Sequence, residues 1–268
     1  MTLGSFLKQI DPTLFSEYQV ERYKDENAAV VRKPDFVPPP MIKPVFKSKP
    51  FDIPTIASLP NDHYAKQYVM ERMIPKEYWN DLYFASDFRM FIEKILPNND
   101  KKLKDNEPRL VIPFFDQKNI LQGLQGRAFG ESQVRYITYR VEEDMIKVFG
   151  LNKVDFTKPI MVVEGPIDSM FLKNSLATMD ASLSRIIQLI GDYDYVFVHD
   201  NEKRNSEIVK SMRQSINTGK KVCIWPSHIA QKDVNDMVVA GLNPQNIISQ
   251  RTFSGPQAML ELEMWRKV

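Results

Sequence analysis

The chain has 268 residues, 43% of them hydrophobic and 26% charged, which is ordinary for a globular protein and sufficient for a buried core. Its 36 Lys and Arg residues nearly balance 34 Asp and Glu residues, which excludes a histone-like polycation. The single cysteine, Cys223, excludes an intramolecular disulfide and a Cys₄ or Cys₂His₂ zinc site. Because no apolar stretch reaches the roughly 18–20 residues that span a bilayer, we expect a cytoplasmic protein without a membrane partner.

The first 57 residues differ in character from the rest. Apolar stripes predict an N-terminal helical segment over residues 1–24. Prolines then recur from Pro34 to Pro54 with interspersed lysines, which predicts an extended linker over residues 25–57. A domain boundary is therefore expected at the end of this linker.

Residues 58–150 predict a small α+β subdomain. The stretch 62–96 has helical spacing, and residues 109–116, 120–129 and 133–140 alternate like the strands of an antiparallel sheet. Between residues 109 and 140, five basic residues outnumber two acidic ones. Positive charge is thus locally concentrated although the chain as a whole is nearly neutral.

Residues 151–268 change to an alternating pattern. Short apolar runs at 160–163, 175–178, 195–199 and 221–225 alternate with helical segments, and helices fill most of 234–266. This alternation predicts an α/β domain whose parallel sheet is covered by helices on both faces.

Acidic residues follow three of these predicted strands. In open α/β sheets the ligand site lies at the carboxyl ends of the strands, so these side chains are expected to lie at one edge. Several carboxylates cannot all stay ionised close together unless cations neutralise them, and Mg²⁺ or Mn²⁺ are the cations that prefer oxygen ligands. The pattern favours metal-dependent phosphoryl transfer by Glu164, Asp168, Asp200, Glu202, Asp233 and Asp236.

An alternative gives these acids a purely structural role. An acidic residue after a strand often caps the next helix. Asp233 is placed to cap a helix beginning at residue 234, and Asp168 lies in a first helical turn, where acids are favoured. Three acidic clusters at successive strand ends favour the metal site over this alternative.

The motifs Glu164-Gly165-x-x-Asp168, Asp200-x-Glu202 and Asp233-x-x-Asp236 together resemble the TOPRIM domain, which primases, topoisomerases and some nucleases share. The resemblance implies a parallel sheet flanked by helices, with Glu164 and Asp168 catalytic and the other four acids binding metal. Glu164 is either a metal ligand or the general base. The family's second motif is usually Asp-x-Asp, so the longer arm of Glu202 is a departure.

The preceding region resembles the basic subdomain of DnaG-type primases. Its elements are Val111-Ile112-Pro113-Phe114, then Gly123-x-x-Gly126-Arg127, then Arg135-Tyr136-Ile137. The sequences around Glu164 and Lys232 resemble those of the T-even-type phage primases. Arginines and tyrosines alternating on a strand suit phosphate contact and base stacking, although each arginine alone could be paired with nearby acids. The candidates for binding nucleic acid or nucleotide are Arg109, Arg127, Arg135, Arg140, Lys147, Lys203, Arg204 and Lys232.

The resemblance implies a DNA primase catalytic core in the host-cell cytoplasm. It would synthesise RNA primers from ribonucleoside triphosphates on single-stranded DNA, beside a replicative helicase. Related primases begin with a Cys-rich zinc module, for which this sequence has no counterpart. This leaves a truncated chain or a gene that lost or separated its zinc part, and in the last case a zinc module acting in trans would be a partner. The alternatives are a TOPRIM nuclease that uses the same carboxylates and a non-catalytic nucleic-acid-binding scaffold of the replication machinery.

Overall fold

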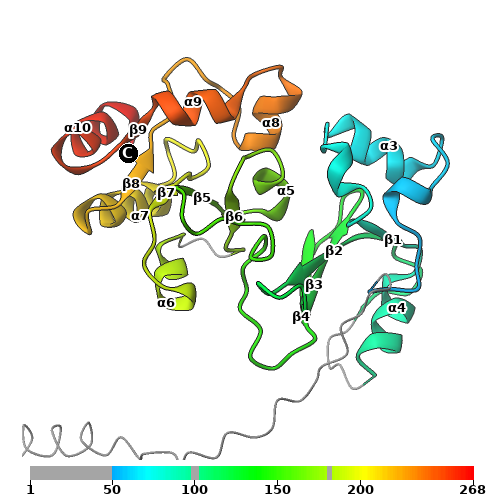
Figure 1. The fold of residues 1–268 in the computed structure, drawn as a ribbon. Coiled ribbons are helices and arrows are strands. Elements are labelled where there is room, and N and C mark those ends of the chain that lie inside the picture. Colours follow the sequence, from blue (N-terminus) through cyan, green and yellow to red (C-terminus); the bar gives the residue numbers. More distant parts are fainter. Residues whose placement is uncertain (1–49, 98–102, 180–182) are drawn as a thin grey trace, which may run out of the picture. The chain divides into compact units, whose positions relative to one another are not determined.

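A computed structural model describes residues 50–97, 103–179 and 183–268 (Figure 1). The chain divides into two units, Met1–Val45 and Phe46–Val268, and every described residue belongs to the second unit. The predicted helical segment 1–24 and most of the predicted linker 25–57 lie outside the described residues. The predicted domain limits at residues 58 and 151 stay predictions.

The first part of the second unit contains an antiparallel sheet with the order β1-β2-β3-β4. The strands β2, β3 and β4 confirm the three predicted ones, although β4 begins three residues later than expected. Strand β1 was not predicted, because three consecutive buried residues inside a helical stretch carry no alternation. The strands are β1 (Tyr83–Ala85), β2 (Arg109–Phe115), β3 (Leu121–Ala128) and β4 (Tyr136–Arg140).

Short helices accompany this sheet. Helix α4 begins where the Asp87 carboxylate accepts a hydrogen bond from the Met90 N–H at 3.0 Å. Its buried side chains, Phe88, Phe91 and Ile92, confirm the helical spacing predicted for this stretch. The helical elements here are η1 (Ile56–Ser58), α3 (Tyr64–Glu71), η2 (Lys76–Tyr78) and α4 (Phe88–Ile95).

The second part contains a sheet with the order β6-β5-β7-β8-β9, which is parallel except for the last pair. The antiparallel strand β9 was not predicted, because its two residues lie between helices. Since β6 and β7 lie on opposite sides of β5, the strand order reverses at β5, and the crevice at such a reversal is where ligands bind. The strands are β5 (Ile160–Val163), β6 (Ser175–Ala177), β7 (Tyr195–Phe197), β8 (Lys221–Cys223) and β9 (Thr252–Phe253).

Helices cover both faces of this sheet, as predicted (Figure 1). Ile160 and Val162 of β5 point into the apolar cluster formed with α7 and α10, whereas Val163 points into the cluster formed with α5, α8 and α9. The helical elements are α5 (Pro166–Ser169), η3 (Leu183–Arg185), α6 (Ile186–Ile190), α7 (Ser206–Asn217), α8 (Val234–Val239), α9 (Pro244–Gln250) and α10 (Gly255–Trp265).

The two sheets share one apolar core. The same buried cluster contains Leu110 and Phe114 of β2 and Val163 and Trp225 of the parallel-sheet part. The segment that follows β4 is also hydrogen-bonded to β6, because the Phe149 N–H donates to the Ala177 carbonyl at 2.8 Å. The carboxyl edge of the parallel sheet is thereby held next to the antiparallel sheet.

Within the three described ranges, none of the helices combines the length and the apolar character that crossing a membrane requires.

Gly126 of β3 is required by the packing of the antiparallel sheet. A Cβ atom at this position would lie 2.3 Å from Cζ of the buried Phe88 ring. No real Cβ contact is that short, so the ring would have to move. By contrast, a Cβ at Gly130 would meet no atom within 4 Å.

We therefore expect Gly126→Ala to lower the free energy of unfolding by roughly 1–3 kcal/mol. Gly130→Ala, the matched control, should change it by less than about 0.5 kcal/mol. Urea denaturation followed by tryptophan fluorescence measures both. Equal stability of the two variants would contradict the packing described here.

Candidate active site

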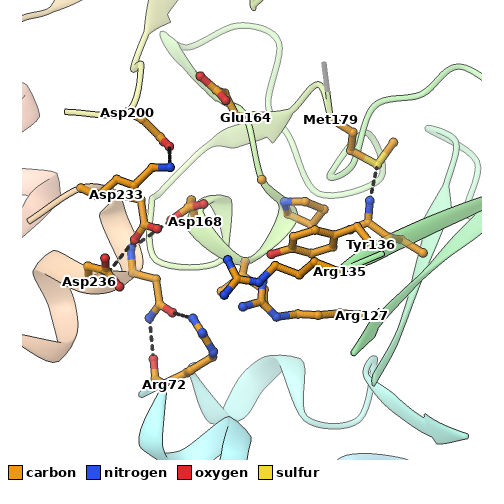
Figure 2. Close-up of a pocket in the computed structure, with 16 residues that line it drawn as sticks. Arg72, Arg127, Arg135, Tyr136, Glu164, Asp168, Met179, Asp200, Asp233 and Asp236 are labelled. Atoms are coloured by element: carbon orange, nitrogen blue, oxygen red, sulfur yellow. Dashed lines mark hydrogen bonds and ion pairs between the residues drawn. The ribbon is translucent and has the colours of Figure 1, made fainter. Parts of the chain in front are cut away.

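A cavity of about 430 Å³ lies at the carboxyl edge of the parallel sheet and is also lined by the antiparallel sheet and α3. Figure 2 shows carboxylates on one side of it and arginines on the other. We call Glu164, Asp168, Asp200, Asp233 and Asp236 the acidic edge, and Arg72, Arg127 and Arg135 the basic side. The structure thus brings together five of the six predicted acids.

The first two acids flank the turn from β5 into α5. Glu164 directly follows β5, and Asp168 lies in the first turn of α5, with Gly165 as the N-cap between them. A Cβ atom at Gly165 would lie 2.8 Å from Oδ2 of Asp168. Only glycine therefore lets the Asp168 carboxylate lie over the start of its own helix.

Lys232 is the cation nearest to Asp200 and Glu202. Its Nζ lies 2.7 Å from Oε1 of Glu202 and 3.7 Å from Oδ2 of Asp200. The other carboxylate oxygen of Glu202 accepts a hydrogen bond from Asn205 Nδ2 at 2.7 Å. These hydrogen bonds lower the pKa of Glu202, and the residue lines a second cavity rather than the first.

Asp233 caps a helix and also lines the cavity. One carboxylate oxygen caps α8 by accepting from the Asp236 N–H at 2.7 Å, so the capping alternative is correct for that oxygen. The residue nevertheless lines the cavity. Asp168 also contacts α8, because its Oδ1 accepts from the Asn235 N–H at 3.0 Å.

Three carboxyl groups of the acidic edge have strongly raised pKa values. Burial, followed by the charges of Asp200 and Glu202, raises the pKa of Glu164 to about 7. Burial and the charge of Asp233 raise the pKa of Asp168 to about 7 and that of Asp200 to about 6. Lys232 opposes the shifts of Glu164 and Asp200 without cancelling them. The acidic edge is therefore short of positive charge at neutral pH.

The donor set of the acidic edge fits Mg²⁺ or Mn²⁺, since every charged donor is a carboxylate oxygen. Among the described residues, no three His, Cys, Asp or Glu side chains converge on a single ion position. Mg²⁺ does not require such a cage, because it is usually held by one or two carboxylates together with waters and substrate phosphates. The spread of carboxylates around the cavity matches that mode of binding.

Arg127 is held between two tyrosines on the basic side. Its Nε donates to the Tyr68 hydroxyl, and its guanidinium carbon lies 4.7 Å from the centroid of the Tyr136 ring. Burial lowers the pKa of Arg127, yet a guanidinium remains charged at any physiological pH. Arg135 lines the same side of the cavity (Figure 2).

Arg109 does not lie at the cavity. Its side chain is 0% exposed and donates to the Gly126 carbonyl, the Val134 carbonyl and the Glu107 carboxylate. It holds the β3–β4 connection to β2, so we correct its assignment as a nucleic-acid contact. An arginine at the start of an apolar strand is expected to stay near the surface, because a buried guanidinium needs acceptors for its N–H groups. Arg109 has such acceptors inside the protein, and the sequence did not reveal them.

Four other predicted basic residues line neither side of this cavity. Arg140 ends β4 and is exposed, and Lys147 is half-buried in the segment that follows. Lys203 and Arg204 line the second cavity, of about 610 Å³, where Lys203 Nζ donates to the Ser227 carbonyl at 2.9 Å.

Sequence reasoning missed Arg72 and Asn235, which both line the cavity. Arg72 lies at the end of a helix far from the acidic motifs in sequence, so nothing in its surroundings indicated the site. Asn235 lies between two acids that were assigned to the site, and this place in the sequence could have indicated that it belongs to the site.

Comparison with known proteins identifies a relative of this chain. No protein-family model matches the chain. It is 32% identical over 273 residues to the DNA primase of Enterobacteria phage T4, an alignment that covers 99% of this chain and 79% of the phage T4 protein.

Solved primase structures share the fold. The Aquifex aeolicus primase structure with zinc-binding and RNA polymerase domains gives a TM-score of 0.52 at 17% identity, covering 72% of this chain but only 57% of the Aquifex chain. A DnaG primase catalytic domain bound to single-stranded DNA gives 0.51 at 12% identity, covering 78% of this chain and 86% of that domain. These likenesses confirm the predicted fold class. The alignment with the phage T4 protein shows that the chain belongs to the DNA primase family.

Proposed function

We propose that this chain synthesises RNA primers on single-stranded DNA by metal-dependent transfer of ribonucleotides. The observation that carries the proposal is the cavity in which the acidic edge lies opposite the basic side. Polymerisation of triphosphates needs divalent cations beside the reacting phosphate and cationic side chains on the remaining phosphates. The membership in the primase family supports this reading.

Asp200, Asp233 and Asp236 would hold Mg²⁺ or Mn²⁺. When bound, the ions would supply the positive charge that binds the incoming triphosphate and stabilises the leaving pyrophosphate. Glu202 would join these ligands only by exchanging its ion pair with Lys232.

Glu164 is assigned as the group that accepts the proton of the attacking 3′-hydroxyl. It lies at the point where the strand order reverses, and its pKa of about 7 matches a general base that works near neutral pH. Asp168 accepts a hydrogen bond from the Asn235 N–H and would thereby keep α8 in place beside Glu164.

The basic side would bind phosphates. Arg127 is already immobilised by Tyr68 and Tyr136, so it would lose little side-chain entropy on binding an anion. Tyr136 is 38% exposed, and a template base could stack on its outer face. Arg140, Lys147, Lys203 and Arg204 would contact nucleic acid outside the cavity. The replicative helicase and a zinc module in trans stay proposed partners that the family resemblance implies.

Primer synthesis tests the proposal directly. The chain is incubated with mixed-sequence single-stranded DNA, labelled ribonucleotides and Mg²⁺ or Mn²⁺, and short RNA products are resolved on a denaturing gel. We expect Glu164→Gln to lower the rate roughly 10²–10⁴-fold, the usual contribution of a general base. Glu131→Gln, at an exposed loop position, is the matched control and should retain full activity.

Two outcomes would contradict this function. Metal-dependent degradation of the DNA, lost in Glu164→Gln, would indicate a nuclease. DNA binding without RNA products, unaffected by loss of the carboxylate, would indicate a non-catalytic scaffold.

The raised pKa of Glu164 also predicts a pH dependence of stability. Its pKa rises from 4.5 to about 7 on folding, so between these values the folded chain binds more protons than the unfolded chain and stability falls as the pH rises. In metal-free buffer near pH 8, Glu164→Gln should therefore be more stable than the wild type, on the order of 1–2 kcal/mol. Near pH 4 the difference should vanish, and Glu131→Gln should show none at either pH. Urea denaturation at both pH values decides this.

Divalent cations should offset the same repulsion. Mg²⁺ at ten times its dissociation constant adds about 1.4 kcal/mol to the stability of a protein that binds it only when folded. We expect such a rise near pH 8, a smaller one near pH 5 where the carboxyls are partly protonated, and little in Asp200→Asn. Thermal unfolding with and without Mg²⁺ measures it, and an unchanged midpoint near pH 8 would show that the acidic edge binds no metal.

A further inference from the structure

Asn235 connects the two sides of the cavity. It is the second residue of α8, is 2% exposed and makes three hydrogen bonds that involve both sides. Its backbone N–H donates to Asp168 Oδ1 at 3.0 Å. Its side-chain Nδ2 donates to the Arg72 carbonyl at 2.7 Å, while its Oδ1 accepts from Arg72 Nη1 at 2.5 Å. The side-chain amide of Asn235 therefore both donates to Arg72 and accepts from it, so a single residue of the basic side satisfies both ends of the amide.

The end of α3 presents Arg72 for this pairing. The Ile74 N–H donates back to the Val69 carbonyl and the Met73 N–H to the Met70 carbonyl, which is the hydrogen-bond pattern of a Schellman motif. Met73 takes the left-handed conformation, with φ of 57°, that this motif requires. Carbonyls in the last turn of a helix lack helical partners, and the Arg72 carbonyl obtains its partner from Asn235.

From Arg72 the contacts continue along the basic side. The Arg72 guanidinium carbon lies 5.0 Å from the centroid of the Tyr68 ring. The hydroxyl of the same tyrosine accepts from Arg127 Nε, and the Arg127 guanidinium stacks on Tyr136. An unbroken series of contacts therefore runs from the carboxylate of Asp168 through Asn235 to the arginines that face it.

We propose that Asn235 is a positioning residue that fixes the separation between the acidic edge and the basic side, and thereby the reach of a nucleoside triphosphate from the metal-binding carboxylates to the arginines. This inference rests on the proposed function for the identity of the ligand. The shared apolar core and the hydrogen bond from Phe149 to Ala177 also join the two parts, but the hydrogen bonds of Asn235 are those that link α8 directly to the end of α3. A misplacement of about 1 Å at a catalytic site can cost about 10²-fold in rate.

Asn235→Ala removes both side-chain hydrogen bonds and keeps the backbone N–H to Asp168. We expect kcat/KM for ribonucleotides to fall roughly 10–100-fold in protein shown to be folded by circular dichroism. Ser175→Ala is the matched control. It also loses two hydrogen bonds, from Ser175 Oγ to the Ser169 and Leu172 carbonyls, but these lie within the parallel-sheet part alone. Its kcat/KM should change less than about twofold.

A distance measurement separates positioning from stability. Spin labels on cysteines introduced at Lys94 of α4 and Lys210 of α7, both exposed, report the separation of the two parts. Native Cys223 is 1% exposed and will not be labelled. We expect a narrow distance distribution in the wild type and in Ser175→Ala, and a wider or shifted one in Asn235→Ala.

An unchanged distribution in folded Asn235→Ala would overturn the proposal, whatever happens to the rate. So would a changed distribution with unchanged kcat/KM. If Asn235→Ala does not fold, Asn235→Asp carries the same test, because it keeps the acceptor for Arg72 Nη1 and loses the donor to the Arg72 carbonyl. The distance measurement needs no activity, so a chain that makes no RNA would refute the proposed function while leaving the role of Asn235 testable.

Discussion

Repulsion among carboxylates is the constraint on which the site depends. The fold brings the ends of β5 and β7 and the start of α8 together, and each delivers an acid. Left alone, these charges would push the strand ends and α8 apart. The structure opposes this by hydrogen-bonding Asp168 and Asp233 to the backbone of α8 and by placing Lys232 beside Asp200 and Glu202. The remaining charge deficit at the acidic edge is what a divalent cation would fill.

The basic side solves the opposite problem. An arginine that must meet a phosphate should be fixed in advance, but burial penalises its charge. Arg127 is 5% exposed and is placed between aromatic rings, whose faces favour a guanidinium without neutralising it. A carboxylate partner would have fixed it equally well but would have competed with the phosphate. The aromatic support therefore keeps the charge available.

Much of this arrangement was predictable because its signals are local. The strands from β2 to β8 carry continuous or alternating apolar residues, and Glu164 and Asp200 are recognised because they closely follow such strands. The errors have physical causes too. β1 lies inside a stretch with helical spacing, and the two residues of β9 lie between helices, so neither strand was visible in the pattern. Arg109 was assigned to nucleic-acid binding because its acceptors include backbone carbonyls, and the sequence does not show which carbonyls a buried arginine will meet. The pairing of Arg72 with Asn235 joins residues 163 positions apart, which only the tertiary structure reveals.

The shared apolar core has a consequence for how this architecture can change over evolution. Modules with separate cores can be exchanged between proteins by joining linkers, whereas here Leu110 and Phe114 are buried in the same cluster as Val163 and Trp225. Transplanting either sheet into a new protein would expose an apolar face that its partner now covers, and exposed patches of that kind promote aggregation. Recombination between genes would therefore have to exchange both sheets together. Changes in the loops at the rim of the cavity leave the shared core intact, so they are the more accessible route to new activities.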